Sequence, residues 1–416
     1  MVGYDSGNTN KSRIIHELYL NMRLFLNYTR CLSNAGALMD SIEQQDEHLN
    51  SQNYVDFSTI TYSPQFAAES FGLTTRRLKD IEEENGIDIR RVPRGTATAR
   101  AYGIADLFKI AAVRRSLGHS KRIGRQIIAS TFIPKGGTGK TTTAVNTAIS
   151  AQFAGMKTLI IDNDPQGDTS SLLGYDPDFG PEDLAEMGIP LDRLVDSHLG
   201  NLISPMLRMK AFEHKNLDQV IKKPFGEDGV HLIPADASLE DLGVCLDASN
   251  NPDMWYAKWI SKACAGEIPG CDLSFYDLII FDNAPAGSRI TKNAVAASDL
   301  LICPIRMDKF ALRALLRLND WCARFAQEYG FSPAMMAIPT MFVKNRPTLL
   351  KNLHRLNTLF PGRVTEEKIY ISEDYSKSME DGVPLLLWKG ATSKSLAPVR
   401  AVHHEVLSKI REIASS

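Results

Sequence analysis

The chain has 416 residues, with 47 Lys/Arg against 49 Asp/Glu and a formal net charge of −2. This length predicts two or three domains, since an ordinary domain has about 150 residues. The sequence has no uninterrupted run of about 18 apolar residues and no basic-then-apolar signal at its N-terminus, which argues against a membrane span and secretion. We expect a cytoplasmic protein whose six cysteines are reduced and mostly buried.

The first predicted element is an amphipathic helix over residues 12–32. Its apolar residues recur at three-four spacing from Ile15 to Leu32. So short a segment has no core of its own, so the helix either packs on the next module or pairs with a second copy of itself. We assign residues 1–50 as an N-terminal helical segment for dimerisation.

Residues 62–87 have the pattern of two short helices joined by a turn. Ser63 is a suitable N-cap, and Pro64 suits the first helical position after it. Gly72 allows a tight turn, and Thr74 can cap the second helix. The pattern predicts a helix-turn-helix.

Basic residues around this motif indicate DNA binding. Residues 76–125 contain 13 Lys/Arg and 6 Asp/Glu, a net charge of +7, so the rest of the chain carries −9. The second helix of such a motif enters the major groove, and the basic, turn-rich residues 90–103 suit a wing that contacts phosphates. We assign residues 55–122 as a winged helix-turn-helix domain, with a plain helical hairpin as the alternative. The expected DNA contacts are Arg76, Arg77, Lys79 and Arg94.

From Gln126 onward, apolar strands alternate with helical stretches. Such uniformly apolar strands are typical of a parallel sheet buried on both faces. Residues 123–416 are therefore predicted to form a doubly wound, mostly parallel α/β domain, whose ligands bind at the carboxyl ends of the strands. The predicted strands are residues 127–133, 158–162, 278–282, 300–305, 334–342 and 368–372.

The stretch IPKGGTGKTTTAVN (133–146) predicts a phosphate-binding loop, and with it an α/β domain (residues 123–416) of the P-loop NTPase type. Its backbone N–H groups and the following helix N-terminus can hold phosphate oxygens. Lys140 would reach the β- and γ-phosphates, and the Thr141 hydroxyl would ligate Mg²⁺. A dinucleotide loop is disfavoured because its third glycine would fall on Thr142. The predicted nucleotide-binding residues are Lys135, Gly136, Gly137, Thr138, Gly139, Lys140, Thr141 and Thr142.

Carboxylates follow two of the predicted strands. Asp162 and Asp164 come after the second strand, and Asp282 ends the apolar run LIIFD. A strand-end aspartate beside a phosphate loop is the Walker-B arrangement, which holds the hydration shell of magnesium. The predicted metal-binding residues are Thr141, Asp162 and Asp282.

Together these motifs resemble the ParA family of plasmid and chromosome partition ATPases, within the deviant-Walker group that includes MinD. The resemblance covers most of residues 126–416, and the N-terminal arrangement is similar to the large, autoregulating class. It rests on KGGTGKTTTAVN, LIIDNDPQGDTSSLLG, YDLIIFDNAPAGSRITKNAVAASDLLICPI and ISEDYSKSMEDGVPLL.

The resemblance implies roles for three catalytic residues, Lys135, Lys140 and Asp164. Lys135 would reach across a nucleotide-sandwich homodimer to the partner's phosphates, and Asp164 would position the attacking water. Asp162 would support the metal or the loop geometry. Because the motif lacks an arginine finger, Mg²⁺-dependent hydrolysis of ATP to ADP should be slow.

The resemblance also implies partners. An ATP-bound dimer would coat DNA non-specifically. The resemblance does not decide whether these dimers also assemble into filaments. A ParB-type centromere-binding protein would stimulate hydrolysis, and the ADP-bound form would repress its own operon. The protein would be associated with the bacterial nucleoid. The non-specific DNA contacts are assigned to Lys351 and Arg355. An ordinary solvent-exposed helix face without DNA contact explains these residues equally well.

Three rival functions remain. A MinD-like membrane cycler needs a C-terminal helix with a bulky apolar face, which residues 397–416 lack. An iron–sulfur reductase ATPase needs paired cysteines after the Walker-B strand, where only Cys303 lies close by. A transcription factor with a degenerate nucleotide site is disfavoured because the site residues Lys140, Thr141, Asp164 and Asp282 are all intact. A DNA-binding transcriptional regulator with a nucleotide-sensing P-loop stays an alternative.

Overall fold

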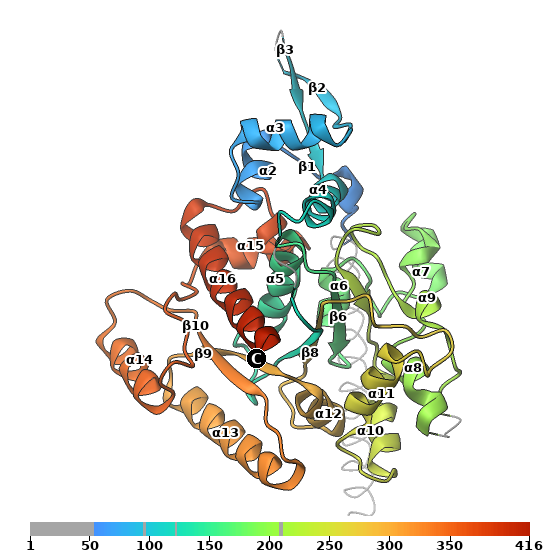
Figure 1. Cartoon of the computed structure of the whole chain (residues 1–416), viewed down its shortest axis with the longest axis vertical. Helices are drawn as coiled ribbons and strands as arrows, with labels where there is room; N and C mark the ends of the chain where they lie inside the picture. The colour runs from blue at the N-terminus through green and yellow to red at the C-terminus, as the bar shows by residue number, and fades with distance from the viewer. Residues whose placement is uncertain (1–53, 95–96, 121–122, 208–210) are drawn as a thin grey trace, which may run out of the picture. The chain divides into compact units, whose positions relative to one another are not determined.

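Figure 1 shows a computed structural model that describes residues 54–94, 97–120, 123–207 and 211–416. The chain divides into two units, Met1–Tyr54 and Val55–Ser416. The helix predicted over residues 12–32 and the dimerisation segment at residues 1–50 lie outside the described residues.

A six-stranded sheet forms the centre of the second unit. All of its neighbouring strands pair in parallel, in the order β10-β9-β5-β8-β6-β7. The middle strands β6 and β8 are buried along their whole length, as expected of a sheet covered on both faces. The predicted doubly wound parallel sheet is confirmed. The strands are β5 (Ile127–Thr131), β6 (Thr158–Asn163), β7 (His231–Ile233), β8 (Leu278–Asn283), β9 (Leu300–Arg306) and β10 (Ala334–Thr340).

Two predictions about the strands were wrong. Strand β7 was missed because three residues are too few to show a periodic pattern. Residues 368–372 do not form a strand, and only an isolated bridge joins Tyr370 to Phe342. Just beyond this bridge, Ser372 caps the next helix, so the chain leaves the sheet edge before a ladder can form.

Helices cover both faces of the sheet (Figure 1). Alternate side chains of β8 explain this, since Ile280 packs in the core on one face and Phe281 in the core on the other. The first face carries α5 (Lys140–Phe153), α15 (Glu373–Glu380), the 3-10 turn η3 (Leu385–Leu387) and α16 (Ser393–Ser415). The second face carries α8 (Leu199–Leu207), α10 (Leu239–Asp247), α11 (Trp255–Cys264), α12 (Arg289–Ala297), α13 (Lys309–Tyr329) and α14 (Pro347–Leu359). The remaining elements are α6 (Asp168–Leu172), α7 (Pro181–Glu186), η2 (Leu191–Arg193) and α9 (Leu217–Val220).

Residues 55–120, called here the helix-turn-helix segment, precede the sheet. The side chains of Ser63 and Thr74 accept hydrogen bonds from the first turns of α2 and α3, as the sequence predicts. Gly72 lies between these helices with a φ of 64°, a conformation that favours glycine. The elements are η1 (Phe57–Thr59), β1 (Thr61–Tyr62), α2 (Pro64–Ser70), α3 (Thr75–Glu84), β2 (Arg91–Arg94), β3 (Ala97–Arg100), β4 (Tyr102–Gly103) and α4 (Ile104–Ser116).

The helix-turn-helix segment shares a hydrophobic core with the sheet. Phe108 of α4 stacks on Phe153 of α5 at 4.9 Å between ring centroids. The Tyr62 hydroxyl donates to the Leu387 carbonyl at 2.5 Å. The domain boundary predicted near residue 122 therefore falls within one continuous core cluster of a single compact unit.

Two further predictions concern the whole chain. Of the helices that the structure describes, none has both the length and the hydropathy to cross a bilayer. In the same residues five cysteines are free thiols, and all except Cys264 are buried. Cys31 lies outside the described residues.

Candidate functional site

The phosphate loop, residues 133–140, connects β5 to α5. Gly137 and Gly139 have φ angles of 64° and 85°, which side-chain-bearing residues rarely adopt. A Cβ atom added at Gly136, Gly137 or Gly139 would meet open space among the described atoms. Since α5 begins directly after the loop, its free N–H groups face the same space, which suits an anion.

Lys140 is the first residue of α5 and is only 8% exposed. Its ammonium donates to the Lys135 carbonyl at 3.1 Å, so the side chain folds over the loop. Burial lowers the pKa of Lys140, while Asp282, Asp164 and Asp168 act in the opposite direction. The lysine charge therefore lies among the strand-end carboxylates that the sequence singles out.

The threonines around the loop have different partners. The Thr138 carbonyl accepts a hydrogen bond of 2.9 Å from the Thr340 hydroxyl, which ties the loop to the end of β10. Thr141 lies near Asp282 and helps to lower the pKa of that carboxyl. Thr142 faces a neighbouring cavity. Of these three threonines, Thr141 is therefore the best candidate for a metal ligand.

Asp282 lies at the end of β8 and is 1% exposed. Burial raises its pKa to about 6, although the hydrogen bond from Thr169 and the nearby Thr141 hydroxyl act to lower it. Its Oδ2 accepts from the Thr169 hydroxyl at 2.8 Å, but its Oδ1 has no partner within the described part of the chain. Since buried polar atoms are nearly always paired, this orphan oxygen fits a cation or the water of a hydrated cation.

Asp162 has a different environment at the end of β6. Its Oδ2 accepts from the Ser170 N–H at 2.9 Å and from the Ser170 hydroxyl at 2.7 Å. Its Oδ1 accepts from the Asp164 N–H at 3.2 Å. Burial and the nearby Asp282 charge raise the pKa of Asp162 to about 8. This geometry favours the loop-supporting role over direct metal binding.

Asp164 lies in the loop after β6, and its Oδ1 accepts from the Gln166 N–H at 3.1 Å. Asp168, which the sequence reasoning missed, begins α6 beside it. Burial and the charge of Asp164 raise the pKa of Asp168, whereas Lys140 lowers it. In the described residues, no three His, Cys, Asp or Glu side chains form an all-protein metal site. A magnesium ion held here would thus need phosphate oxygens and water as further ligands, its usual coordination.

Lys135 is held apart from Lys140. Its ammonium pairs with both oxygens of Asp308 at 2.7 and 2.9 Å. The Asp308 side chain also accepts from the Phe310 and Ala311 N–H groups and so caps α13. Burial alone would raise the pKa of Asp308, but Lys135 and the cap hydrogen bonds lower it overall. Asp308 was missed because it lies more than 170 residues beyond the loop.

A cavity of about 420 Å³ opens beside the phosphate loop. Its walls include Gly139 and Thr142 on one side and Met341, Tyr370 and Tyr375 on the other. Met341 has a φ of 49°, which is uncommon for a residue with a side chain and often marks a ligand site. A largely apolar pocket next to an anion loop suits a planar base attached to phosphates.

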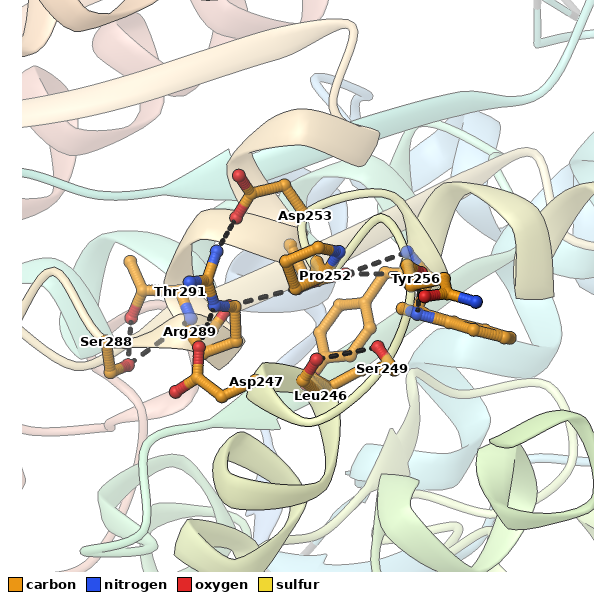
Figure 2. A network of polar contacts seen from close by, with 12 residues as sticks. Leu246, Asp247, Ser249, Pro252, Asp253, Tyr256, Ser288, Arg289 and Thr291 are labelled. Carbon is orange, nitrogen blue, oxygen red and sulfur yellow. Dashed lines mark hydrogen bonds and ion pairs between the residues drawn. The ribbon is translucent and has the colours of Figure 1, made fainter. Parts of the chain in front are cut away.

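A polar network beside the site fixes the start of α12 (Figure 2). Arg289 donates to Asp247 at 2.5 Å and to Asp253, so one guanidinium joins α12 to both ends of the α10–α11 connection. The Asn293 side chain accepts from the Trp255 N–H at 2.9 Å. These contacts hold the helices that follow the Walker-B strand.

The same region reaches the strand ends through buried amides. The Tyr256 hydroxyl donates to Asn163 Oδ1 at 3.0 Å, and the Asn163 amide donates to Asn283 Oδ1 at 2.7 Å. Asn163 and Asn283 are paired in register directly after Asp162 and Asp282. The repeated Asp-Asn at both strand ends was the signal that sequence reasoning missed.

The predicted DNA-contacting residues lie in two places. On α3, Arg76 is exposed, Arg77 pairs with Glu84 at 3.5 Å and Lys79 pairs with Glu83 at 3.2 Å. Arg94 ends β2 opposite Ala97 in the hairpin, and its side chain is not described.

The second group is on and before α14. Lys351 and Arg355 are exposed one turn apart, after the exposed Lys344 and Arg346. Within the described residues none of the four pairs with a carboxylate, so their charges are available to a phosphate backbone.

Comparisons with known proteins agree with this geometry. A family model described as an AAA domain matches residues 125–331. The chromosome-partitioning ATPase Soj of Thermus thermophilus is 29% identical over 184 residues, which are 44% of this chain and 56% of that protein. The chromosome partitioning protein ParA of Myxococcus xanthus is 25% identical over 290 residues, 69% of this chain and 89% of that one. The chain is therefore similar to the ParA family of partition ATPases.

Solved structures show the same ParA-family fold. Apo McdA of Cyanothece matches with a TM-score of 0.52 at 20% identity, over 68% of this chain and 100% of that one. A putative plasmid partition protein of Borrelia burgdorferi, bound to AMPPNP, matches with a TM-score of 0.50 at 21% identity, over 68% and 99%. At these identities the likeness concerns the fold alone.

Proposed function

We propose that this ParA-family protein is a magnesium-dependent ATPase that partitions DNA. One observation carries the proposal. The phosphate loop with Lys140 and the unpartnered Oδ1 of Asp282 meet at the carboxyl ends of parallel strands, beside a cavity that suits a base. ParA-family relatives named for chromosome partitioning support the biological role.

The nucleotide would be ATP, exchanged for ADP after hydrolysis. The loop N–H groups and Lys140 would bind its phosphates, and the cavity at Met341 would take its base. Thr141 and Asp282 would hold Mg²⁺, whose charge neutralises the oxygens between the β- and γ-phosphates. The partition protein of Borrelia burgdorferi bound to AMPPNP supports this class of ligand.

Hydrolysis would be completed by a second copy of the chain. Lys135 would exchange Asp308 for the partner's nucleotide, which a half-exposed ion pair permits at modest cost. Asp164 would orient a water whose oxygen attacks the γ-phosphorus while the bond to the bridging oxygen breaks. A flexible lysine suits this contact between subunits, because an ammonium group can bind phosphate oxygens without the planar, two-point geometry that a guanidinium needs.

Non-specific DNA binding would use Lys351 and Arg355 of the ATP-bound dimer. Neutralising phosphates in this way is independent of sequence and sensitive to salt. A ParB-type protein bound at a centromere would stimulate hydrolysis and so release the dimer from DNA. The ATP-bound protein would be associated with the bacterial nucleoid, as a dimer or as a filament of dimers.

Operator binding would use the helix-turn-helix segment, as in the large class of ParA proteins. Arg76 would contact bases or phosphates in the major groove, with the β2–β3 hairpin as a wing. Arg77 and Lys79 would exchange their exposed carboxylate partners for phosphates at little cost. A nucleotide-sensing repressor is the second candidate, because this segment shares its core with the ATPase part.

The test is binding to random-sequence duplex DNA without nucleotide, with ADP and with ATP–Mg²⁺, at one near-physiological salt concentration. We expect tight binding with ATP–Mg²⁺ alone, and none in Lys140→Ala. Equal binding in all three states would instead favour the constitutive regulator.

A second test separates the two DNA surfaces. Arg76→Ala with Arg77→Ala should abolish binding to the promoter DNA and leave ATP-dependent binding to random DNA unchanged. Lys351→Ala with Arg355→Ala should have the opposite effect. Loss of both activities in either double variant would refute two separate surfaces.

A further inference from the structure

A second cavity lies where the helix-turn-helix segment meets the ATPase helices. It has a volume of about 780 Å³, and residues of α2, α4, α5 and α16 line it. Figure 1 shows these four helices close to one another. We call it the joint cavity, and it shares no lining residue with the cavity beside the phosphate loop.

Three arginines line the joint cavity: Arg114, Arg400 and Arg411. Among the described residues that line it, Glu69 is the only carboxylate, and it lies 3.8 Å from Arg400. Within the described part of the chain, Arg114 and Arg411 have no carboxylate partner. The cavity therefore carries an excess of two positive charges, with both histidines counted as neutral.

These charges are partly removed from water. Burial lowers the pKa of Arg114, Arg400 and Arg411, although Glu69 opposes this for Arg400. The Nε of Arg411 is buried and has no hydrogen-bond partner among the described residues. A guanidinium donor in this position is unfavourable unless an acceptor reaches it.

Hydroxyl groups and rings complete the wall. Ser120 Oγ is also buried without a partner in the described residues, and Ser150 and Ser408 face the same space. Phe71 and Phe153 contribute apolar surface, and Arg114 lies over the Phe71 ring at 5.2 Å. Arginine forks with hydroxyls suit phosphate oxygens, and the rings suit an organic group attached to them.

We propose that the joint cavity binds a phosphorylated small molecule, at a site separate from the phosphate loop. Its volume lies in the range of small-ligand pockets, which often form where two modules meet. A phosphate of duplex DNA carries the same chemistry. A free ligand is favoured because the orphan Nε and Oγ atoms are buried, so a phosphate must enter the cavity to reach them. Occupancy would bridge α2 to α16 and hold the helix-turn-helix segment against the ATPase core.

The test uses the full chain with Lys140→Ala, so that the phosphate loop contributes no binding. Inorganic pyrophosphate is titrated by calorimetry at low ionic strength. We expect saturable binding that Arg400→Gln with Arg411→Gln weakens at least tenfold. Arg324→Gln, an exposed arginine of α13, is the matched control and should leave the affinity unchanged. Absence of binding, or equal binding by the double variant, would overturn the proposal.

Glu69→Gln provides a test in the opposite direction. Removing the only carboxylate should tighten pyrophosphate binding severalfold, because Arg400 no longer has a competing partner. An unchanged affinity would count against the site even if the double arginine variant failed to fold.

A duplex DNA arm distinguishes the source of the phosphate. If Arg400→Gln with Arg411→Gln weakens duplex binding but not pyrophosphate binding, the cavity contacts DNA and the small-molecule proposal is wrong. Loss of pyrophosphate binding with normal duplex binding supports it.

Discussion

The phosphate loop and the joint cavity both gather positive charge around a space for an anion, but they are built differently. The loop places eight consecutive residues between one strand and one helix. The joint cavity brings Glu69, Arg114, Arg400 and Arg411 together from α2, α4 and α16. The phosphate loop is formed by residues that are consecutive in the sequence. The joint cavity is formed by residues that come together only when the chain folds.

This difference affects how each site is held. Backbone conformation at Gly137 and Gly139 shapes the loop, so its anion donors are in place before any ligand arrives. The joint cavity depends on long side chains, which lose conformational freedom when they bind. We therefore expect the loop to bind more tightly, and the joint cavity to respond more strongly to salt.

Lys140→Ala should have the largest effect. It removes the ammonium that neutralises the nucleotide phosphates, and we expect ATP affinity to fall at least a hundredfold, equivalent to about 2.7 kcal/mol. Calorimetry with ATP–Mg²⁺ measures it. Lys262→Ala, which removes a half-exposed lysine of α11, is the control. Pyrophosphate binding at the joint cavity should persist in this variant, and its absence would count against that site.

Asp164→Ala should reduce turnover by about 10²–10⁴-fold, the usual contribution of a positioned acid–base group. ATP binding should remain close to normal because Asp164 is not part of the loop. Single-turnover hydrolysis and equilibrium binding measured together separate the two effects. Normal turnover would disprove the water-positioning role.

Asp282→Asn should stabilise the nucleotide-free protein while impairing Mg²⁺-dependent hydrolysis. Burial raises the pKa of Asp282 to about 6, so above pH 6 the folded chain bears the cost of a buried charge. A rise of about 2 pKa units corresponds to about 3 kcal/mol, so the gain in unfolding free energy should be about 3 kcal/mol at pH 8 and should shrink progressively between pH 6 and pH 4. Urea unfolding at pH 8 and pH 5 tests this, and a pH-independent difference would argue against it.

Asp308→Asn should have the smallest effect. The substitution removes the ion pair with Lys135 but keeps a side chain able to cap α13. We expect ATP-dependent dimerisation to tighten by about twofold to fivefold, since exposed pairs contribute less than about 1 kcal/mol. Sedimentation with a non-hydrolysable ATP analogue gives the dimer constant. Weaker dimerisation would mean that Asp308 orients Lys135 for the partner instead of restraining it.

The local signals in the sequence predicted most of the nucleotide end of the sheet. Five of the six strands, the start of α5 at Lys140 and the caps at Ser63 and Thr74 agree with the structure. Each depends on neighbouring residues, either through apolar runs or through a side chain that bonds the adjacent helix turn. The short strand β7 and the false strand at residues 368–372 depend on edge pairing, which no local pattern specifies.

Other site residues could not be predicted because their partners are distant in the chain. Asp308 and Lys135 are 173 residues apart, and Asn163 and Asn283 are 120 apart. The exact role of Asp162 was also open, since a strand-end aspartate can bind metal or hold a loop. Its three hydrogen bonds to Ser170 and Asp164 favour the second role.

By itself the sequence determined the family, the parallel sheet and the phosphate loop, because periodic burial, glycine conformation and strand-end charge act over a few residues. Only the tertiary structure decided which carboxylate oxygen stays unpartnered, where Lys135 rests and that three arginines share one cavity. Those features arise from side chains that meet after the chain has folded, and contacts across more than a hundred residues leave no periodic trace in the sequence.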